Sequence, residues 1–419
     1  MMDPDPQMIE RLSITAGRHL EKLCREIPTR QVGSDGNRVA TEYFAEITRQ
    51  IGYQVTSPQF NCVDWATDGA TCVVAGKSYP VLPSPYSNGC RVKARLFAVS
   101  TLAELQNVQC QGEMLLVFGD LAREQLMPKN YPFYNPEGHQ LTIALLEEKA
   151  PAAIIAATSR NPELAGAVYP FPLIEDGNFP IPSVYTTEET GQELALLAGQ
   201  SVDLVSRARR IPASGCIVLA RKKPSAYRKI VICAHIDAKI GTPGALDNAA
   251  GVITLLLAAE LLKNYDGEMG IELLAMNGED YYGANGELLY LELNQNLLGS
   301  IALFINMDGL GYIKGRTAFS FYNLLEENRL VLESVITARD GLMQGEQWYQ
   351  GDHMVLVMNG VAAVAVTTEH FMEMEREFAH TAKDVPELVS PEKLAVAACA
   401  IHDIVAVWEK LEAGTFTGR

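Results

Sequence analysis

The C-terminal half of the chain alternates apolar runs with helix-length segments, and this alternation constrains the fold more than any other feature. Near-continuous apolar runs are expected to form strands at 230–235, 271–276, 301–307 and 361–367. Helices are expected at 248–263, 286–294, 327–339 and 391–411. Buried strands separated by helices are typical of a parallel sheet covered on both faces. We therefore predict an α/β fold with a doubly wound, mostly parallel sheet.

The segment at about 85–210 differs from the rest of the chain in composition and in the length of its predicted elements. It is rich in proline, with short strand candidates at 114–118, 152–157 and 183–186 and short helix candidates at 102–106, 141–149 and 188–197. A chain of 419 residues exceeds what one hydrophobic core usually serves. We predict a smaller inserted α/β domain at 85–210 and a discontinuous main domain formed by 1–84 and 211–419. Helices at 8–26 and 35–51, the second stopped by Gly52, belong to the main domain.

Charge and cysteine usage exclude several classes of protein. The 34 Lys and Arg against 51 Asp and Glu give a net charge of −17, which repels phosphate backbones and argues against a nucleic-acid partner. No run approaches the roughly 18 apolar residues of a membrane span, and no basic leader precedes an apolar run. The eight cysteines contain no CxxC pair, as expected for reduced thiols. We predict a cytoplasmic protein without a membrane partner.

Histidines and acidic residues follow the predicted strands, at the sheet edge where functional groups gather in such folds. They come from five segments of the chain: His235 and Asp237, Asp247, Glu279 and Asp280, Asp308, and His380. Imidazole and carboxylate groups are the common ligands of zinc where cysteine is absent. The pattern therefore predicts a zinc site at this edge.

The number of candidate ligands suffices for two zinc ions per chain. Two metals about 3.5–4 Å apart need a carboxylate that bridges them. Asp247 is expected to bridge, because it lies in a stiff glycine-containing turn that opens a helix. His235 and Asp308 then complete one site, and Asp280 and His380 complete the other.

Asp237 and Glu279 are expected to support the chemistry without binding metal. Asp237 is placed to accept the spare N–H of the His235 ring, and Glu279 to take a proton from the metal-bridging water. Taken singly, these residues have structural explanations, such as a helix cap for Asp247 or a turn at Asp308. Their meeting at one edge is what favours a catalytic site.

Five motifs appear in an order that resembles a known family: AHID at 234–237, TPGALDNAAG at 242–251, NGED at 277–280, NMD at 306–308 and HTAKD at 380–384. They are similar to those of the dizinc aminopeptidases, in one family of zinc metallopeptidases with glutamate carboxypeptidase, the transferrin receptor and the glutaminyl cyclases. The resemblance spans about 211–419. The segments GEMLLV at 112–117 and PIPSV at 180–184 look like strands of the protease-associated domain that many members carry.

The resemblance implies the phosphorylase/hydrolase-like fold of zinc exopeptidases, with two zinc ions and a peptide substrate. It implies the same five ligands and Glu279 as general base and acid. Two positions depart from the family. Asp280 stands where a second Glu is usual, which puts one metal site in doubt, and Ala379 replaces a Tyr that helps hold the oxyanion in some members. Candidate replacement donors are Tyr281, Tyr282 and His353.

We predict a metal-dependent exopeptidase, most simply an aminopeptidase that hydrolyses N-terminal residues. Acidic residues before the last histidine favour a free amine in the substrate: Glu369, Glu373 and Glu375. A carboxypeptidase is an alternative, with a terminal carboxylate bound by Lys239, Arg316 or Arg376. A single-zinc acyltransferase like glutaminyl cyclase and a non-catalytic scaffold are further alternatives. The inserted domain is expected to shape access to the site or to mediate oligomerisation.

Overall fold

The computed structural model describes residues 5–27 and 29–414, which divide into two compact units. The larger unit comprises the described residues of 1–60, 214–281 and 285–419, and the smaller unit comprises 61–213 and 282–284. The smaller unit begins ahead of the boundary expected near residue 85, because the long strand β2 (Gln59–Val74) joins its sheet.

The larger unit is built on an eight-stranded sheet whose four central strands are parallel. In spatial order the strands are β1 (Gln54–Thr56), β10 (Val218–Lys222), β12 (Gly270–Met276), β11 (Lys229–His235), β13 (Ile301–Met307), β16 (Ala363–Thr368), β14 (Thr317–Tyr322) and β15 (Leu342–Gln344). The prediction of an α/β fold with a mostly parallel sheet is confirmed. The antiparallel strands β10 and β14 that flank the parallel core were not expected.

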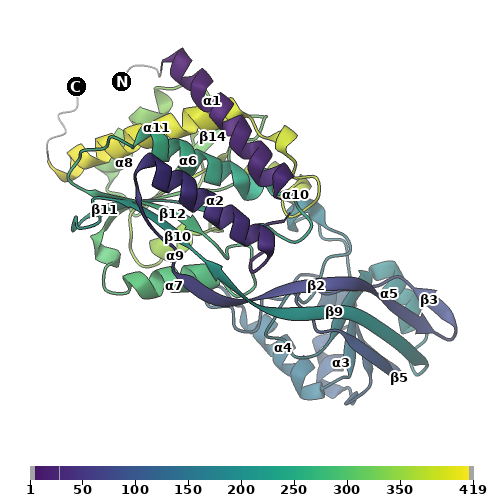
Figure 1. The fold of residues 1–419 in the computed structure, drawn as a ribbon. Coiled ribbons are helices and arrows are strands. Elements are labelled where there is room, and N and C mark those ends of the chain that lie inside the picture. The colour runs from purple at the N-terminus through teal and green to yellow at the C-terminus, as the bar shows by residue number, and fades with distance from the viewer. Residues whose placement is uncertain (1–4, 28, 415–419) are drawn as a thin grey trace. The chain divides into compact units, whose positions relative to one another are not determined.

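Helices cover both faces of this sheet, with α6 and α11 on one side and α7 on the other (Figure 1). The helices of this unit are α1 (Pro6–Glu21), α2 (Asp35–Ile51), α6 (Ala250–Leu261), α7 (Asn285–Asn294), α8 (Glu326–Thr337), α9 (His353–Val357), α10 (Phe371–Glu377) and α11 (Pro391–Glu412). Helix α6 is apolar on almost every side because it lies between β11 and the helices α1 and α11. In the described ranges, no helix combines the length and the apolar character needed to cross a bilayer.

Local capping explains where these helices begin and end. The Asp5 side chain accepts the N–H of Gln7 at the start of α1, and Ser34 accepts the N–H of Asn37 at the start of α2. Gly52 ends α2 with φ of 101°, a left-handed conformation that glycine adopts without strain, as predicted. The start of α1 and both ends of α2 therefore follow from short sequence signals.

The smaller unit is a second eight-stranded mixed sheet with helices α3 (Leu102–Asn107), α4 (Glu137–Lys149) and α5 (Glu188–Ala195). In spatial order its strands are β3 (Lys77–Tyr79), β2, β9 (Ser201–Cys216), β5 (Cys90–Val99), β6 (Met114–Val117), β7 (Ala153–Thr158), β8 (Ser183–Thr187) and β4 (Leu82–Pro83). Strands β5 to β8 are parallel. Buried apolar side chains form two clusters in this unit, as a sheet with two packed faces requires.

Short helical turns complete the two units. They are η1 (Lys22–Glu26), η2 (Gly119–Ala122), η3 (Ala165–Ala167), η4 (Ala245–Ala249), η5 (Leu298–Ser300) and η6 (Pro386–Leu388). Of these, η4 carries Asp247 and leads into α6.

Candidate metal centre

The carboxyl ends of the parallel strands bring the predicted site residues together in the larger unit. His235 is the last residue of β11, and its strand partner Met276 is the last residue of β12. The Glu279–Asp280 pair follows β12, and Asp308 directly follows β13. The parallel register therefore places the ends of three strands side by side, as expected for a functional edge.

The two oxygens of Asp247 face different histidines. Asp247 Oδ1 lies 3.2 Å from Nε2 of His235, and Asp247 Oδ2 lies 3.2 Å from Nε2 of His380. Each histidine has a second carboxylate beside it. Asp308 Oδ1 is 3.5 Å from the His235 nitrogen, and Asp280 Oδ1 is 3.0 Å from the His380 nitrogen. All five predicted ligands thus meet, in two groups that share Asp247.

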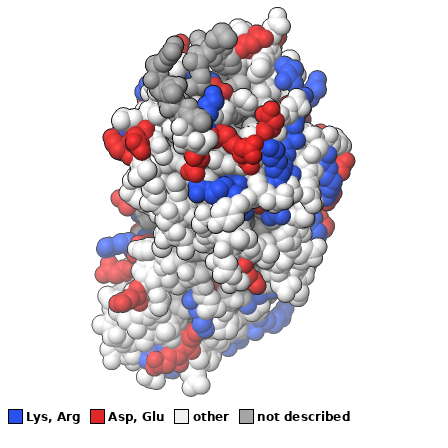
Figure 2. All heavy atoms as spheres, turned by 90° about the vertical axis from the view of Figure 1, so that its left-hand side faces the viewer, with Lys and Arg blue, Asp and Glu red and all other residues white. Residues whose placement is uncertain are grey.

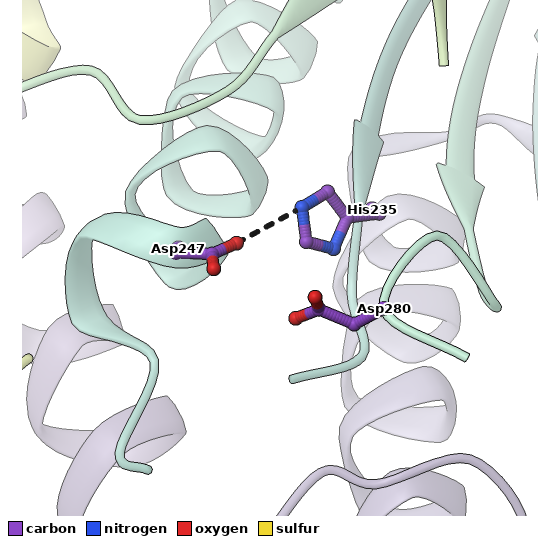
Figure 3. Close-up of side chains that lie close together, drawn as sticks. All are labelled: His235, Asp247 and Asp280. Atoms are coloured by element: carbon purple, nitrogen blue, oxygen red, sulfur yellow. Dashed lines mark ion pairs between the residues drawn. The ribbon is translucent and has the colours of Figure 1, made fainter. Parts of the chain in front are cut away.

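The donor set fits a metal ion. Ligand atoms of His235, Asp247 and Asp280 all lie within 4.8 Å of one another, and the three side chains converge from the end of β11, the turn before α6 and the loop after β12 (Figure 3). Both ring nitrogens of His235 and Oδ2 of Asp280 are buried and have no hydrogen-bond partner. Buried polar atoms are rarely left unsatisfied in proteins. A cation between these groups would satisfy Nε2 of His235, the nitrogen that faces Asp247, and Oδ2 of Asp280.

The electrostatics of the site show how closely its charges are coupled. Burial would lower the pKa of His235, but the nearby carboxylates, Asp308 first, raise that pKa well above its usual range. Burial acts on His380 in the same way and is likewise outweighed, chiefly by Asp280. Burial would raise the pKa of Asp247, but the two histidine rings beside its oxygens hold that pKa below its usual range. Concentrated negative charge of this kind attracts a cation to the two imidazoles.

Two further aspartates hold the ligand-bearing loops in place. Asp237 accepts the backbone N–H groups of Gly278 at 2.8 Å and of Asp280 at 3.0 Å, and so fixes the loop after β12. Its Oδ1 lies 3.7 Å from Nδ1 of His235, which is too long for the hydrogen bond that was expected there. Asp384 accepts the N–H groups of Leu246 at 2.8 Å and Asp247 at 3.0 Å. The carboxylates of these two residues therefore position metal ligands through the backbone.

Arg30 is a buried supporting residue that the sequence did not reveal. Its guanidinium donates to four backbone carbonyls, those of Leu23, Ile236, Pro243 and Gly244, at 2.7 to 3.0 Å. Ile236 follows His235, and Gly244 begins the turn that carries Asp247. One arginine thus ties together the two segments that carry the ligands, but no local motif marks it.

Glu279 lies half-buried beside the ligands. Burial raises its pKa well above the usual range; the charge of His235 opposes this rise and that of Asp280 adds to it. Burial also raises the pKa of its neighbour Asp352 to about 7. Buried acids of this kind hold protons more readily than exposed ones, which suits a group that takes up and releases a proton.

His353 does not fit the role of oxyanion donor. It is buried on α9, with Nε2 at 3.1 Å from the carbonyl oxygen of Trp348 and Nδ1 at 3.4 Å from the amide nitrogen of Asn306. Burial lowers its pKa to about 4, so the ring is neutral at physiological pH. His353 therefore has a packing role.

The fold and the site place the chain among α/β proteins with a candidate His–Asp metal centre. Residues 217–405 match the model of Peptidase family M28, and this stretch contains every predicted site residue. Over 295 residues the chain is 25% identical to the probable lipoprotein aminopeptidase LpqL of Mycobacterium tuberculosis, which covers 67% of this chain and 55% of that protein. The chain therefore spans about half the length of this curated relative.

Two solved structures share the fold over nearly the whole of each chain. The aminopeptidase from Aneurinibacillus sp. strain AM-1 has a TM-score of 0.72 at 20% identity, covering 96% of this chain and 95% of that one. BSAP, a zinc aminopeptidase from Bacillus subtilis, has a TM-score of 0.71 at 18% identity, covering 94% of each chain. The family match and these neighbours support a zinc metallopeptidase. A protease-associated inserted domain, kinship with glutaminyl cyclases and the transferrin receptor, and a cytoplasmic location stay predictions.

Proposed function

We propose that this protein is a metal-dependent aminopeptidase that binds two zinc ions. The observation that carries the proposal is the placement of Asp247, whose two oxygens face two histidines that each have a second carboxylate beside them. Aminopeptidase is also the word in the names of LpqL and of both structural neighbours. His235 and Asp308 would hold one ion, Asp280 and His380 the other, and Asp247 would bridge.

Bound zinc supplies Lewis acidity, which polarises a carbonyl oxygen and lowers the pKa of an attacking water. Side chains of this protein transfer the proton and position the metal ligands. Glu279 takes the proton from the attacking water and returns it to the amine that leaves. Asp237 and Asp384 keep the loops of Asp280 and Asp247 in place through their backbone hydrogen bonds.

Glu375 favours an aminopeptidase over a carboxypeptidase. Of the three acids in the segment before His380, Glu369 pairs with Arg316, and Glu373, on α10, pairs with Lys314. Glu375 forms no ion pair within the described ranges, and burial raises its pKa to about 8, with His380 and Asp247 close enough to influence it. A bound ammonium group would oppose the effect of burial and favour the ionised form of Glu375, so this half-buried acid near the metal ligands suits a substrate amine.

Cations for a carboxypeptidase are less available. Arg316 is occupied by Glu369, with 2.9 Å between Nη2 and Oε1, and Arg376 by Glu377, with 2.8 Å between Nε and Oε1. Neither arginine is left without an acidic partner, so binding a terminal carboxylate at Arg316 or Arg376 would require breaking an existing ion pair.

Replacing Glu279 by Gln tests the proposal. The amide cannot accept the proton, so we expect kcat on aminoacyl p-nitroanilides to fall by about 10²–10⁴-fold while zinc content stays at two per chain. The matched control is Glu369→Gln, a change of the same size on the loop before His380, which should leave kcat within about twofold. N-acetylated substrates should not be cleaved. One zinc per chain together with glutaminyl cyclase activity, or unchanged hydrolysis by Glu279→Gln, would contradict the proposal.

A further inference from the structure

A cavity of about 800 Å³ lies at the end of the large sheet opposite to the metal centre. Its lining includes the end of β10, the beginnings of β11 and β12, and residues after α7. Lys229 lines the cavity at one end of β11, whereas His235 lies at the other end, about 20 Å away at the usual rise per residue of a strand. The cavity is therefore separate from the metal centre.

Basic residues dominate the charge of this cavity. The charged residues in its lining are four cations, Arg221, Lys222, Lys223 and Lys229, and a single carboxylate, Glu272. The chain as a whole has a net charge of −17, so a local excess of positive charge is unusual for it. Figure 2 shows the face on the left-hand side of Figure 1, where Lys and Arg side chains lie among Asp and Glu side chains.

The four cations are held in place by partners that leave donors free. Lys222 Nζ donates to the carbonyl of Lys263 at 2.6 Å and lies 4.6 Å from the centre of the Tyr53 ring. Lys223 Nζ donates to the carbonyls of Asp266, at 2.9 Å, and Gly267. These carbonyls are neutral, so neither lysine has its charge compensated by a carboxylate within the described ranges. Burial lowers the pKa of Lys222, as expected for a charge without an acidic partner.

Glu272 is shared by the other two cations. Its Oε2 lies 2.6 Å from Nε of Arg221, and its Oε1 lies 2.9 Å from Nζ of Lys229. An arginine side chain carries five N–H donors and a lysine three, so each of the four cations retains at least one. The residues that line the cavity thus carry more positive than negative charge, and each cation has at least one donor without a partner within the described ranges.

Apolar side chains border the same cavity. Tyr227, Leu293 and Leu297 contribute to its lining and are 83%, 46% and 53% exposed. Exposed apolar groups next to a concave surface are typical of ligand sites. A ligand that uses both features has an anionic head and an apolar body.

We propose that this cavity binds a small organic anion, with its carboxylate or phosphate group at Lys222 and Lys223 and its apolar part against Leu293 and Leu297. The cations are already anchored, so little side-chain ordering opposes binding. The inference does not rest on the peptidase activity, because the cavity and the metal centre occupy opposite ends of β11.

Calorimetric titration of the zinc-loaded protein with octanoate, phenyl phosphate and inorganic phosphate tests the proposal. We expect octanoate or phenyl phosphate to bind with a Kd below about 1 mM. Inorganic phosphate should bind at least about tenfold more weakly, because it lacks an apolar part. Preference between octanoate and phenyl phosphate distinguishes a carboxylate ligand from a phosphate ligand, and either preference supports the site.

The variant Lys222→Gln/Lys223→Gln should weaken binding of the preferred probe by at least about tenfold. The matched control is Arg91→Gln/Lys93→Gln, which removes the same charge from exposed positions on β5. Zinc content and unfolding midpoint confirm that each variant is folded. Equal binding by both double variants would overturn the proposal, as would the absence of binding of all three probes to the unmodified protein.

Discussion

Asp280 reaches the second histidine of the metal centre although its side chain is one methylene shorter than that of a Glu. Its Oδ1 lies 3.0 Å from Nε2 of His380, and its Oδ2 is buried without a partner. Asp280→Asn removes the charge that attracts a cation here. We expect zinc affinity at this position to fall by more than about tenfold, so that dialysed protein retains about one zinc. Asp280→Glu, which keeps the charge, serves as the control. Two tightly held ions in Asp280→Asn would contradict the assignment.

Arg30 ties the segment after His235 to the turn of Asp247 through four carbonyl hydrogen bonds. Arg30→Met leaves these buried carbonyls without their donor. We expect a loss of about 2–5 kcal/mol in the free energy of unfolding, measured in urea without metal. Zinc affinity should fall as well, since the ligands are less well positioned. Arg91→Met, on the exposed face of β5, should change neither quantity. Unchanged zinc affinity in Arg30→Met would show that its role is confined to stability.

At the residue scale, the sequence predicted those residues that combine a metal-binding side chain with a position after a strand or at the start of a helix. His235, Asp247, Asp280, Asp308 and His380 follow strands or open a helix, so their meeting follows from a parallel sheet. Arg30 could not be found this way, because its partners are backbone carbonyls and any sequence supplies those. Glu375 could not be separated from Glu369 and Glu373, since only the fold shows which of these acids are neutralised by Arg316 and Lys314.

At the element scale, α1 and α2 meet through a buried histidine. His19 Nδ1 lies 2.6 Å from the hydroxyl oxygen of Tyr43, and burial lowers the pKa of His19 to about 4. The unfolded chain binds a proton near pH 6.5 and the folded chain only near pH 4, so the stabilisation is present above pH 6.5 and is lost as pH falls towards 4. The full effect is on the order of 3 kcal/mol.

His19→Gln tests this pH dependence. We expect the difference in unfolding free energy between the unmodified protein and His19→Gln to shift by about 2–3 kcal/mol against the unmodified protein between pH 7 and pH 4. Urea unfolding of both proteins with EDTA removes any contribution from metal binding. Parallel pH curves for the two proteins would show that folding does not lower the pKa of His19.

Strands differ in how well they can be predicted from the sequence. Strands β12, β13 and β16 are buried at every position and are mostly apolar, so they appear in the sequence as near-continuous apolar runs. Strands β2 and β9 are long, with buried and exposed positions interspersed, and include charged residues such as Asp64 and Arg207. Strand β14 pairs antiparallel with β16, and its pairing depends on a distant segment. Such strands are defined by tertiary contacts more than by local pattern.

At the scale of the whole molecule, chemistry is concentrated in one of the two units. The metal centre and the basic cavity lie at opposite ends of one sheet, within 214–281 and 285–419 together with residues before 60. The smaller unit has two apolar clusters of its own. Each unit thus has a core of its own, and metal binding need stabilise only the unit that carries the ligands.

Hydrogen exchange measured with zinc and with EDTA tests this separation. Zinc that binds only the folded site stabilises it by about 2.7 kcal/mol at a hundred times the Kd. We expect chelation to increase exchange in η4, β11 and β12, where the ligands and their supports lie, and to leave β6 and β7 of the smaller unit unchanged. Addition of zinc should restore the protection. Equal deprotection of β6 and β7 would mean that the two units unfold as one cooperative body, because a ligand bound to one part of a cooperative unit stabilises all of it.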